Sequence, residues 1–162
     1  MRKVTRTLTL DCDANTVWSM FFDDAFIRGV HLDGMEFREL EILKKTDTTR
    51  SLRAVPKMDA PAAVAKLLGD RFGYEERATL DREKNEWRFS MIPNALGDKL
   101  RTEGVTRLEA LGDDRVRRRD EVTFDCKVFG LGGLIEGTAE KQLKTSWEKE
   151  EAFVRRWLAK KD

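Results

Sequence analysis

The sequence predicts one α+β domain in which a curved antiparallel sheet wraps around a long C-terminal helix. Three observations carry this expectation. Apolar and polar residues alternate with a period of two along most of residues 35–128, which is typical of half-buried strands. The connections between these alternating segments have hairpin length, whereas parallel strands need long crossovers. Residues 131–160 carry one apolar stripe at helical spacing, and a sheet with one apolar face needs such an element to cover it.

Composition limits the functions that this domain can have. A chain of 162 residues is long enough for a single domain with one real core. Charged residues make up 38% of it, well above the usual quarter, so we expect a densely charged exterior. The formal charge is only +1, because 31 basic residues are balanced by 30 acidic ones. This balance argues against a nucleic-acid partner, which normally selects for a clear basic excess.

The sequence also indicates where the protein works. The basic start is not followed by the apolar run of a signal peptide, and no segment approaches the 18 apolar residues of a membrane span. Transient contact with a membrane stays open, as does the oligomeric state. Cys12 and Cys126 lie in strand-like segments and not in a CxxC pair, which favours free thiols in a reducing cytoplasmic compartment.

The N-terminal part predicts a strand followed by two short helices. Residues 2–12 alternate and are rich in threonine, as in a half-buried strand. Asp13 is a good N-cap for a helix that follows it. A second short helix is expected over residues 25–30, closed near Gly29 or Gly34.

The rest of the chain predicts a meander of strands before the long helix, so the whole sheet has about six or seven strands. The further strands are expected at residues 35–45, 48–56, 71–82, 85–93, 99–111 and 115–128. Residues 59–69 interrupt them, and we interpret this segment as a short helix or lid that Asp59 caps and Gly69 ends.

Strand alternation predicts which side chains face the long helix and would line a ligand cavity. The expected ligand-binding residues are Leu67 from the insert and, from the strands, Phe72, Tyr74, Glu76, Trp87, Phe89, Thr102, Gly104, Thr106, Arg118, Asp120 and Phe124. Thr102, Gly104 and Thr106 are small residues at three successive inward positions, which predicts space beneath the sheet. The alternative is that bulky neighbours fill this space.

Three of these inward residues carry charges, namely Glu76, Arg118 and Asp120. They could hold the polar head of a ligand or polarise a carbonyl group. Alternatively they lie at strand ends near solvent or pair with one another, because an unpaired buried charge is costly.

The sequence predicts no catalytic residue, no metal ligand and no cofactor. His31 is the only histidine, and we expect it on the surface of a loop. One histidine and two separated cysteines make no zinc-ligand set, and motifs of serine nucleophiles and phosphate loops are absent from the sequence. Glycines 130, 132 and 133 are expected to allow close packing at a strand-to-helix corner. Whether the protein is an enzyme stays open, and the sequence favours binding.

Three segments resemble an uncharacterised bacterial family within the START-like (SRPBCC) superfamily. They are Val55-Pro56 with the short helix ending in Leu67-Leu68-Gly69, the strand pair around Trp87, and the entry Gly132-Gly133-Leu134-Ile135-Glu136 into the last helix. The element order is similar to the helix-grip fold of this superfamily, which includes steroidogenic-acute-regulatory lipid-transfer domains, plant Bet-v-1-type proteins and polyketide cyclases. The resemblance covers nearly the whole chain and supplies no catalytic motif. It implies a deep cavity between sheet and helix that binds hydrophobic molecules.

The sequence is therefore compatible with three functions. The first is a non-catalytic carrier or sensor of an apolar small molecule, such as a lipid, an isoprenoid or a polyketide-like compound. The second is an enzyme of the polyketide cyclase/dehydratase type that uses the same cavity, and the third is a protein-interaction module with a filled core. A polar group deep in the cavity with a shifted pKa would separate the first two. Tyr74, Glu76, Arg118 and Asp120 are the candidates for such a group.

Overall fold

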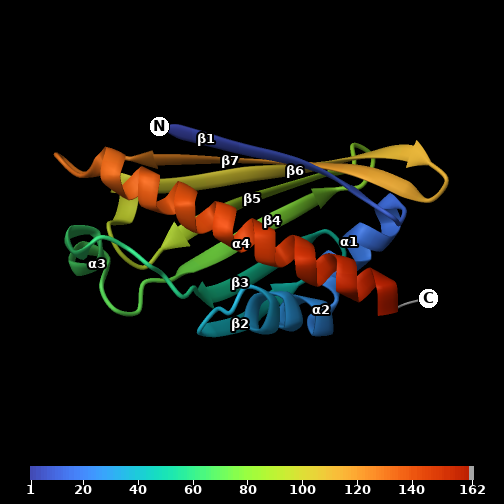
Figure 1. Ribbon diagram of the computed structural model, residues 1–162, viewed down its shortest axis with the longest axis horizontal. Coiled ribbons are helices and arrows are strands. Elements are labelled where there is room, and N and C mark those ends of the chain that lie inside the picture. Colours follow the sequence, from blue (N-terminus) through green and yellow to red (C-terminus); the bar gives the residue numbers. More distant parts are fainter. Residues whose placement is uncertain (161–162) are drawn as a thin grey trace.

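The computed structural model describes residues 1–160 and shows a seven-stranded antiparallel sheet that curves around one long helix, α4 (Gly132–Lys160) (Figure 1). The strands are β1 (Arg2–Leu10), β2 (Glu39–Lys45), β3 (Thr49–Val55), β4 (Tyr74–Asp81), β5 (Glu86–Pro93), β6 (Leu100–Gly112) and β7 (Arg115–Cys126). Their order in the sheet is β1-β7-β6-β5-β4-β3-β2. Strands β2 to β7 thus follow one another as a meander, and β1 lies at the edge of the sheet beside β7.

Every strand that the alternation predicts is present, with ends that differ by a few residues. The largest difference is at β2, which begins at Glu39 and not at residue 35. The residues before Glu39 do not extend the strand, because Gly29–Gly34 forms a π-helical turn, η1, and Glu36 has a positive φ of 61°. The prediction of the long helix over residues 131–160 is confirmed within one residue.

Two short helices follow β1, as predicted. Helix α1 (Ala14–Phe22) begins at the expected cap, since the Asp13 carboxylate accepts a hydrogen bond of 2.8 Å from the backbone N–H of Thr16. Helix α2 (Asp24–Arg28) is capped in the same way by Asp23 and runs directly into η1. The second helical segment is therefore longer than expected and includes His31.

Helix α3 (Ala62–Leu68) lies between β3 and β4, in the predicted insert. The prediction that Asp59 caps it is wrong, because the helix begins later and Pro61 occupies the cap position. Gly69 ends the helix as expected, with a φ of +89° that favours glycine. A short 3-10 turn, η2 (Gly97–Lys99), precedes β6.

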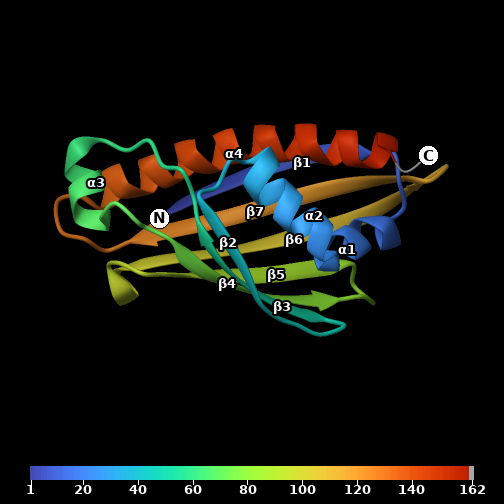
Figure 2. The same cartoon turned by 90° about the horizontal axis from the view of Figure 1, so that it is seen from below.

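Helix α4 crosses the concave face of the sheet, and α1, α2 and η1 cover the same face beside it (Figures 1 and 2). At the end where α1 lies, the Phe21 ring packs edge to face with Trp18 and with Trp87, at centroid distances of 5.4 and 5.1 Å. At the other end, Val64 and Leu68 of α3 form a second apolar cluster with residues of β6, β7 and α4. A third, smaller cluster consists of Val4, Val122 and Phe124 on β1 and β7, and the site described below lies between the first two clusters.

The long helix begins at a tight corner after β7. A Cβ built on Gly132 would lie 2.5 Å from the carbonyl oxygen of Cys126, so the corner between β7 and α4 needs a glycine, as the sequence indicates. No helix within residues 1–160 combines the length and the apolar character that crossing a bilayer requires.

Candidate functional site

A cavity of about 210 Å³ lies between the concave face of the sheet and α4. Aromatic side chains form much of its wall, and they include Phe72, Trp87, Phe89, Phe124 and Trp147. The cavity extends between the two apolar clusters, since Phe21 and Trp87 from one cluster and Met58 and Phe72 beside the other both line it. A concave, mostly apolar space with a few polar groups is the usual form of a small-molecule site.

The structure brings ten of the twelve predicted site residues together around this cavity. They are Phe72, Tyr74, Glu76, Trp87, Phe89, Thr102, Thr106, Arg118, Asp120 and Phe124. Leu67 is not among the lining residues, because it lies on the outer side of α3 with 39% of its surface exposed. Its neighbours Val64 and Leu68 are the buried residues of that helix.

Gly104 faces inward but does not line the cavity either. It lies opposite Phe89 in the pairing of β5 and β6, and a Cβ built on it would lie 2.2 Å from Cζ of the Phe89 ring. The expected space beneath the three small residues is therefore absent at Gly104, where the bulky neighbour fills it, and present at Thr102 and Thr106, which line the cavity.

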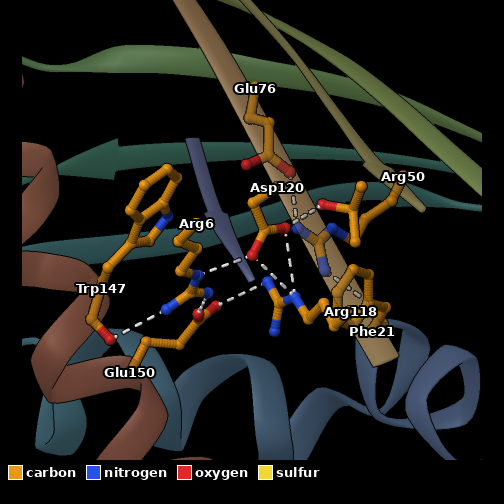
Figure 3. A network of polar contacts seen from close by, with 9 residues as sticks. Arg6, Phe21, Arg50, Glu76, Arg118, Asp120, Trp147 and Glu150 are labelled. Atoms are coloured by element: carbon orange, nitrogen blue, oxygen red, sulfur yellow. Dashed lines mark hydrogen bonds and ion pairs between the residues drawn. The ribbon is translucent and has the colours of Figure 1, made fainter. Parts of the chain in front are cut away.

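Four charged side chains form a closed set at one wall of the cavity, which we call the charge ring: Arg6, Asp120, Arg118 and Glu150 (Figure 3). Asp120 Oδ2 lies 2.6 Å from Nε of Arg6 and 3.0 Å from Nε of Arg118. Glu150, on α4, pairs with Arg6 and lies 3.4 Å from Nη2 of Arg118. Positive and negative groups alternate around the ring, so each charge has two opposite neighbours.

Neutral groups complete the hydrogen bonding of the charge ring. The Thr106 hydroxyl donates to Asp120 Oδ1, and Nη1 of Arg6 donates to the backbone carbonyl of Trp147 at 3.0 Å. Burial alone would raise the pKa of Glu150, but the charges of Arg118 and Arg6 outweigh it and lower that pKa to about 2. Glu150 is therefore ionised throughout the neutral range, and the pairing within the ring offsets the cost of burying four charges.

A second buried ion pair joins β3 and β4. Arg50 Nη2 lies 2.5 Å from Glu76 Oε1, and Arg50 Nη1 donates to the carbonyl of Phe21 at 2.6 Å. The guanidinium group also lies over the Trp87 ring, 4.7 Å from its centroid. Glu76 is thus buried and paired, and so are Arg118 and Asp120. Of the two alternatives for these inward charges, the structure therefore has the one in which they form ion pairs. Arg118 and Asp120 pair with each other as expected, whereas Glu76 pairs with Arg50, which was not among the predicted site residues.

Sequence analysis missed Arg6, Arg50 and Glu150, yet a signal for each was present. Arg6 stands at the inward parity of β1 with Val4 and Leu8, which are buried. Arg50 has the parity of the buried Leu52 on β3. Glu150 lies one helical turn from both Trp147 and Val154 on the apolar stripe. A charged residue at an apolar position of a strand or helix predicts a buried charge, and a buried charge requires an opposite partner.

The expectation that His31 lies on a loop surface is wrong. His31 is 7% exposed, belongs to η1 and lines the cavity. Its Nδ1 lies 2.7 Å from the carbonyl oxygen of Ile27, one turn earlier. Burial is the main reason why the pKa of His31 is lowered, so the ring is neutral at pH 7. The cause of the error is local, because the helix continues beyond residue 30 and turns the side chain inward.

Tyr74 also lines the cavity, at the start of β4. Burial raises the pKa of its hydroxyl, and the charge of Glu76 adds to this effect. The hydroxyl is therefore protonated at all ordinary pH values. Within residues 1–160, no group of three or more His, Cys, Asp or Glu side chains is arranged to hold a metal ion.

Several solved structures share this fold at low sequence identity. The Zhui aromatase/cyclase from Streptomyces sp. R1128 matches with a TM-score of 0.62 and 18% identity, over 96% of this chain and 89% of its own. A START superfamily protein from Mycobacterium smegmatis matches with a TM-score of 0.64 and 15% identity, over 96% and 98% of the two chains.

Norcoclaurine synthase from Thalictrum flavum, solved with dopamine and hydroxybenzaldehyde, matches with a TM-score of 0.64 and 15% identity, over 94% of this chain and 86% of its own. At such identities the likeness concerns the fold alone. Among curated protein sequences, none matches this chain significantly. The profile of the family described as "Protein of unknown function (DUF2505)" matches residues 5–158, so the chain belongs to this family, and its fold is the helix-grip fold of the START-like superfamily.

Proposed function

We propose that the protein binds a hydrophobic small molecule in the cavity between the sheet and α4, as a carrier or sensor. The observation that carries this proposal is the cavity itself, about 210 Å³ with a mostly apolar wall that includes several aromatic side chains. Transfer of apolar surface from water into such a space is favourable by about 25 cal/mol per Å². The charged side chains beside the cavity are paired with one another, so the apolar part of the wall can contact a ligand.

The volume favours a compact ligand over a long-chain lipid. An engineered apolar cavity of about 150 Å³ holds benzene, whereas pockets for drug-sized ligands have about 300–1,000 Å³. A cavity of about 210 Å³ therefore suits a compound of one or two rings. A compact isoprenoid or a small aromatic polyketide-like compound fits this description.

The charges favour a neutral ligand. The charge ring and the pair of Arg50 with Glu76 together contain three guanidinium groups and three carboxylates. Their formal sum is zero, and each of them already has an opposite partner. A charged ligand would have to compete for one of these buried pairs and leave another charge uncompensated, which is costly.

The second candidate is an enzyme of the polyketide cyclase/dehydratase type in the same cavity. The observation that favours it is His31, a neutral imidazole at the cavity wall, because such a group can act as a general base. Two compared proteins are named for reactions, an aromatase/cyclase and norcoclaurine synthase, and the latter was solved with two one-ring compounds. The interaction-module alternative needs a filled core, which a cavity of this volume disfavours.

Titration with naphthalene tests the binding proposal. Trp87 and Trp147 line the cavity, so a bound aromatic compound should change the tryptophan fluorescence. We expect a saturable change with a stoichiometry of one, and weaker binding of a long-chain alcohol such as hexadecanol. Absence of a saturable signal from naphthalene would contradict the proposal. Native mass spectrometry of protein from its own host would then identify any retained compound.

A pair of threonine variants shows whether the signal comes from the cavity. Thr102 lines it, so Thr102→Leu should fill part of the space and weaken naphthalene binding at least tenfold. Thr123 does not line the cavity and lies at the opposite parity of β7, so Thr123→Leu should leave binding unchanged. Equal effects of both variants would place the binding elsewhere.

A further inference from the structure

Seven ionisable side chains line the cavity, and five of them are held in ion pairs. The paired residues are Arg50, Glu76, Arg118, Asp120 and Glu150. The two others are His31 and Tyr74. The charges of these five are balanced by opposite partners, although Nε of Arg50 has no hydrogen bond within the described residues. His31 and Tyr74 are the two ionisable groups of the wall that stand outside the ion pairs, and they can bind the polar atoms of a ligand.

The contacts of His31 determine which of its ring nitrogens carries the proton. Nδ1 lies 2.7 Å from the carbonyl oxygen of Ile27, and a carbonyl oxygen can only accept a hydrogen bond. Nδ1 therefore carries the hydrogen, and in the neutral ring Nε2 has a free lone pair. No hydrogen bond to Nε2 is found among residues 1–160, and the side chain lines the cavity.

The charges around His31 come from three elements. They are Arg50 of β3, Glu76 of β4 and Glu150 of α4, and the first opposes protonation while the carboxylates favour it. Burial is larger than each of these effects and lowers the pKa of His31, so the ring stays neutral. Nε2 is consequently an uncharged hydrogen-bond acceptor at the cavity wall.

Tyr74 supplies the complementary group. Tyr74 lines the cavity, and its hydroxyl has no hydrogen bond within the described residues. Burial keeps it protonated by raising its pKa, so it can donate a hydrogen bond. Tyr74 begins β4 and His31 belongs to η1, and both side chains line the same cavity.

We propose that His31 and Tyr74 are the polar recognition groups of the cavity and select a neutral ring compound that carries a hydroxyl group and a carbonyl group. His31 Nε2 accepts a hydrogen bond from the ligand hydroxyl, and the Tyr74 hydroxyl donates one to the carbonyl oxygen. The inference rests on the proposed binding function and narrows its ligand to hydroxylated, carbonyl-bearing ring compounds. A carboxylate is excluded, because it would bring a negative charge to a neutral acceptor and to a set of balanced ion pairs.

Four two-ring probes of one shape test this inference: naphthalene, 2-naphthol, 2-acetylnaphthalene and 2-naphthoate. Tyr74→Phe deletes only the hydroxyl, so it should weaken 2-acetylnaphthalene about fivefold relative to naphthalene. His31→Phe should weaken 2-naphthol by about the same factor relative to naphthalene. Met91→Leu changes an apolar part of the wall and should shift all neutral probes together. 2-Naphthoate should bind more weakly than naphthalene to the unaltered protein.

A spectroscopic measurement keeps the histidine half of the inference testable if His31→Phe fails to fold. His31 is the only histidine in the chain, so ¹⁵N-histidine labelling gives one pair of ring resonances. The Nε2 resonance should move on addition of 2-naphthol and stay in place on addition of naphthalene. If naphthalene does not bind to the unaltered protein, the binding proposal itself fails. If naphthalene binds, but the probe ratios and the Nε2 resonance do not respond, the recognition by His31 and Tyr74 is refuted.

Discussion

The ring of Phe89 on β5 lies over Gly104 on β6, at the point where the two residues are paired in the sheet. A Cβ on Gly104 would lie 2.2 Å from Cζ and 2.6 Å from Cε1 of this ring, closer than any stable contact. Phe89 also forms part of the cavity wall. The missing side chain of Gly104 thus leaves room for the outer atoms of the Phe89 ring, which would otherwise be pushed toward the cavity.

Gly104→Ala should lower both stability and affinity. The new methyl group has to displace the Phe89 ring toward the cavity, and such overpacking costs about 1–3 kcal/mol. The displaced ring occupies space that naphthalene would use, so naphthalene affinity should fall as well. Denaturant unfolding and fluorescence titration measure the two effects.

Two controls belong to this variant. Gly133→Ala adds the same methyl group where no atom lies within 4 Å, so it should leave stability and binding nearly unchanged. In the background of Phe89→Leu, the additional cost of Gly104→Ala should shrink, because the clash partner is smaller. An unchanged cost in that background would mean that Phe89 is not what Gly104 accommodates.

Glu150→Gln should destabilise the protein by about 3 kcal/mol at pH 7, since it leaves Arg6 and Arg118 with one carboxylate between them. Glu148→Gln is the matched control on the same helix, because Glu148 is exposed and should tolerate the change within about 0.5 kcal/mol. Chemical denaturation of both variants measures the difference. Equal values would show that the charge ring adds nothing to the attachment of α4.

The same carboxylate makes stability depend on pH in the acid range. Its pKa in the folded protein is about 2, lower than its ordinary value of 4.5. A lowered pKa means that the unfolded chain binds more protons, so stability is fully present above about pH 4.5 and falls as the pH drops toward 2. Glu150→Gln should flatten this part of the stability curve measured by denaturation between pH 5 and 2.

Both cysteines should titrate as free thiols after denaturation without reductant. Cys12 follows β1, whose last residue pairs with Val116, and Cys126 ends β7, so they lie near opposite ends of one strand. This separation corresponds to roughly 30 Å of extended chain, far beyond the roughly 7 Å limit for a disulfide. In the folded protein Cys12 should react slowly, because burial raises its pKa to about 11. A count below two would contradict the topology.

Helix α3 should exchange its amide hydrogens faster than α4 in the free protein. It is a single seven-residue helix anchored by Val64 and Leu68, and the segments on either side of it contribute Met58 and Phe72 to the cavity wall. Naphthalene should slow this exchange by holding the flanking segments. Protection as strong as that of α4 without ligand would argue against a lid.

The sequence predicted the sheet, the long helix and most of the cavity wall because strand parity is a local property. Parity placed Tyr74, Thr102 and Arg118 inward, and the structure has them there. It could not predict that Phe89 would lie over Gly104, since this depends on how far one side chain reaches across a neighbouring strand. The inward turn of His31 was equally hidden, because it depends on the π-helical continuation of α2.

The charge ring has a consequence for how the protein acquires its cavity. Its contacts join Arg6 to Asp120 and to Glu150, which lie 114 and 144 positions further along the chain (Figure 1 shows blue β1 at the edge of the sheet beside orange β7, with red α4 crossing the sheet). Strands β2 to β7, by contrast, pair with their neighbours in sequence and can form hairpins early. Closing so long a loop costs entropy that only the completed contact recovers. We therefore expect the cavity to arise late in folding, when the two most distant parts of the chain meet, so that a partly folded chain has a sheet but no place for a ligand.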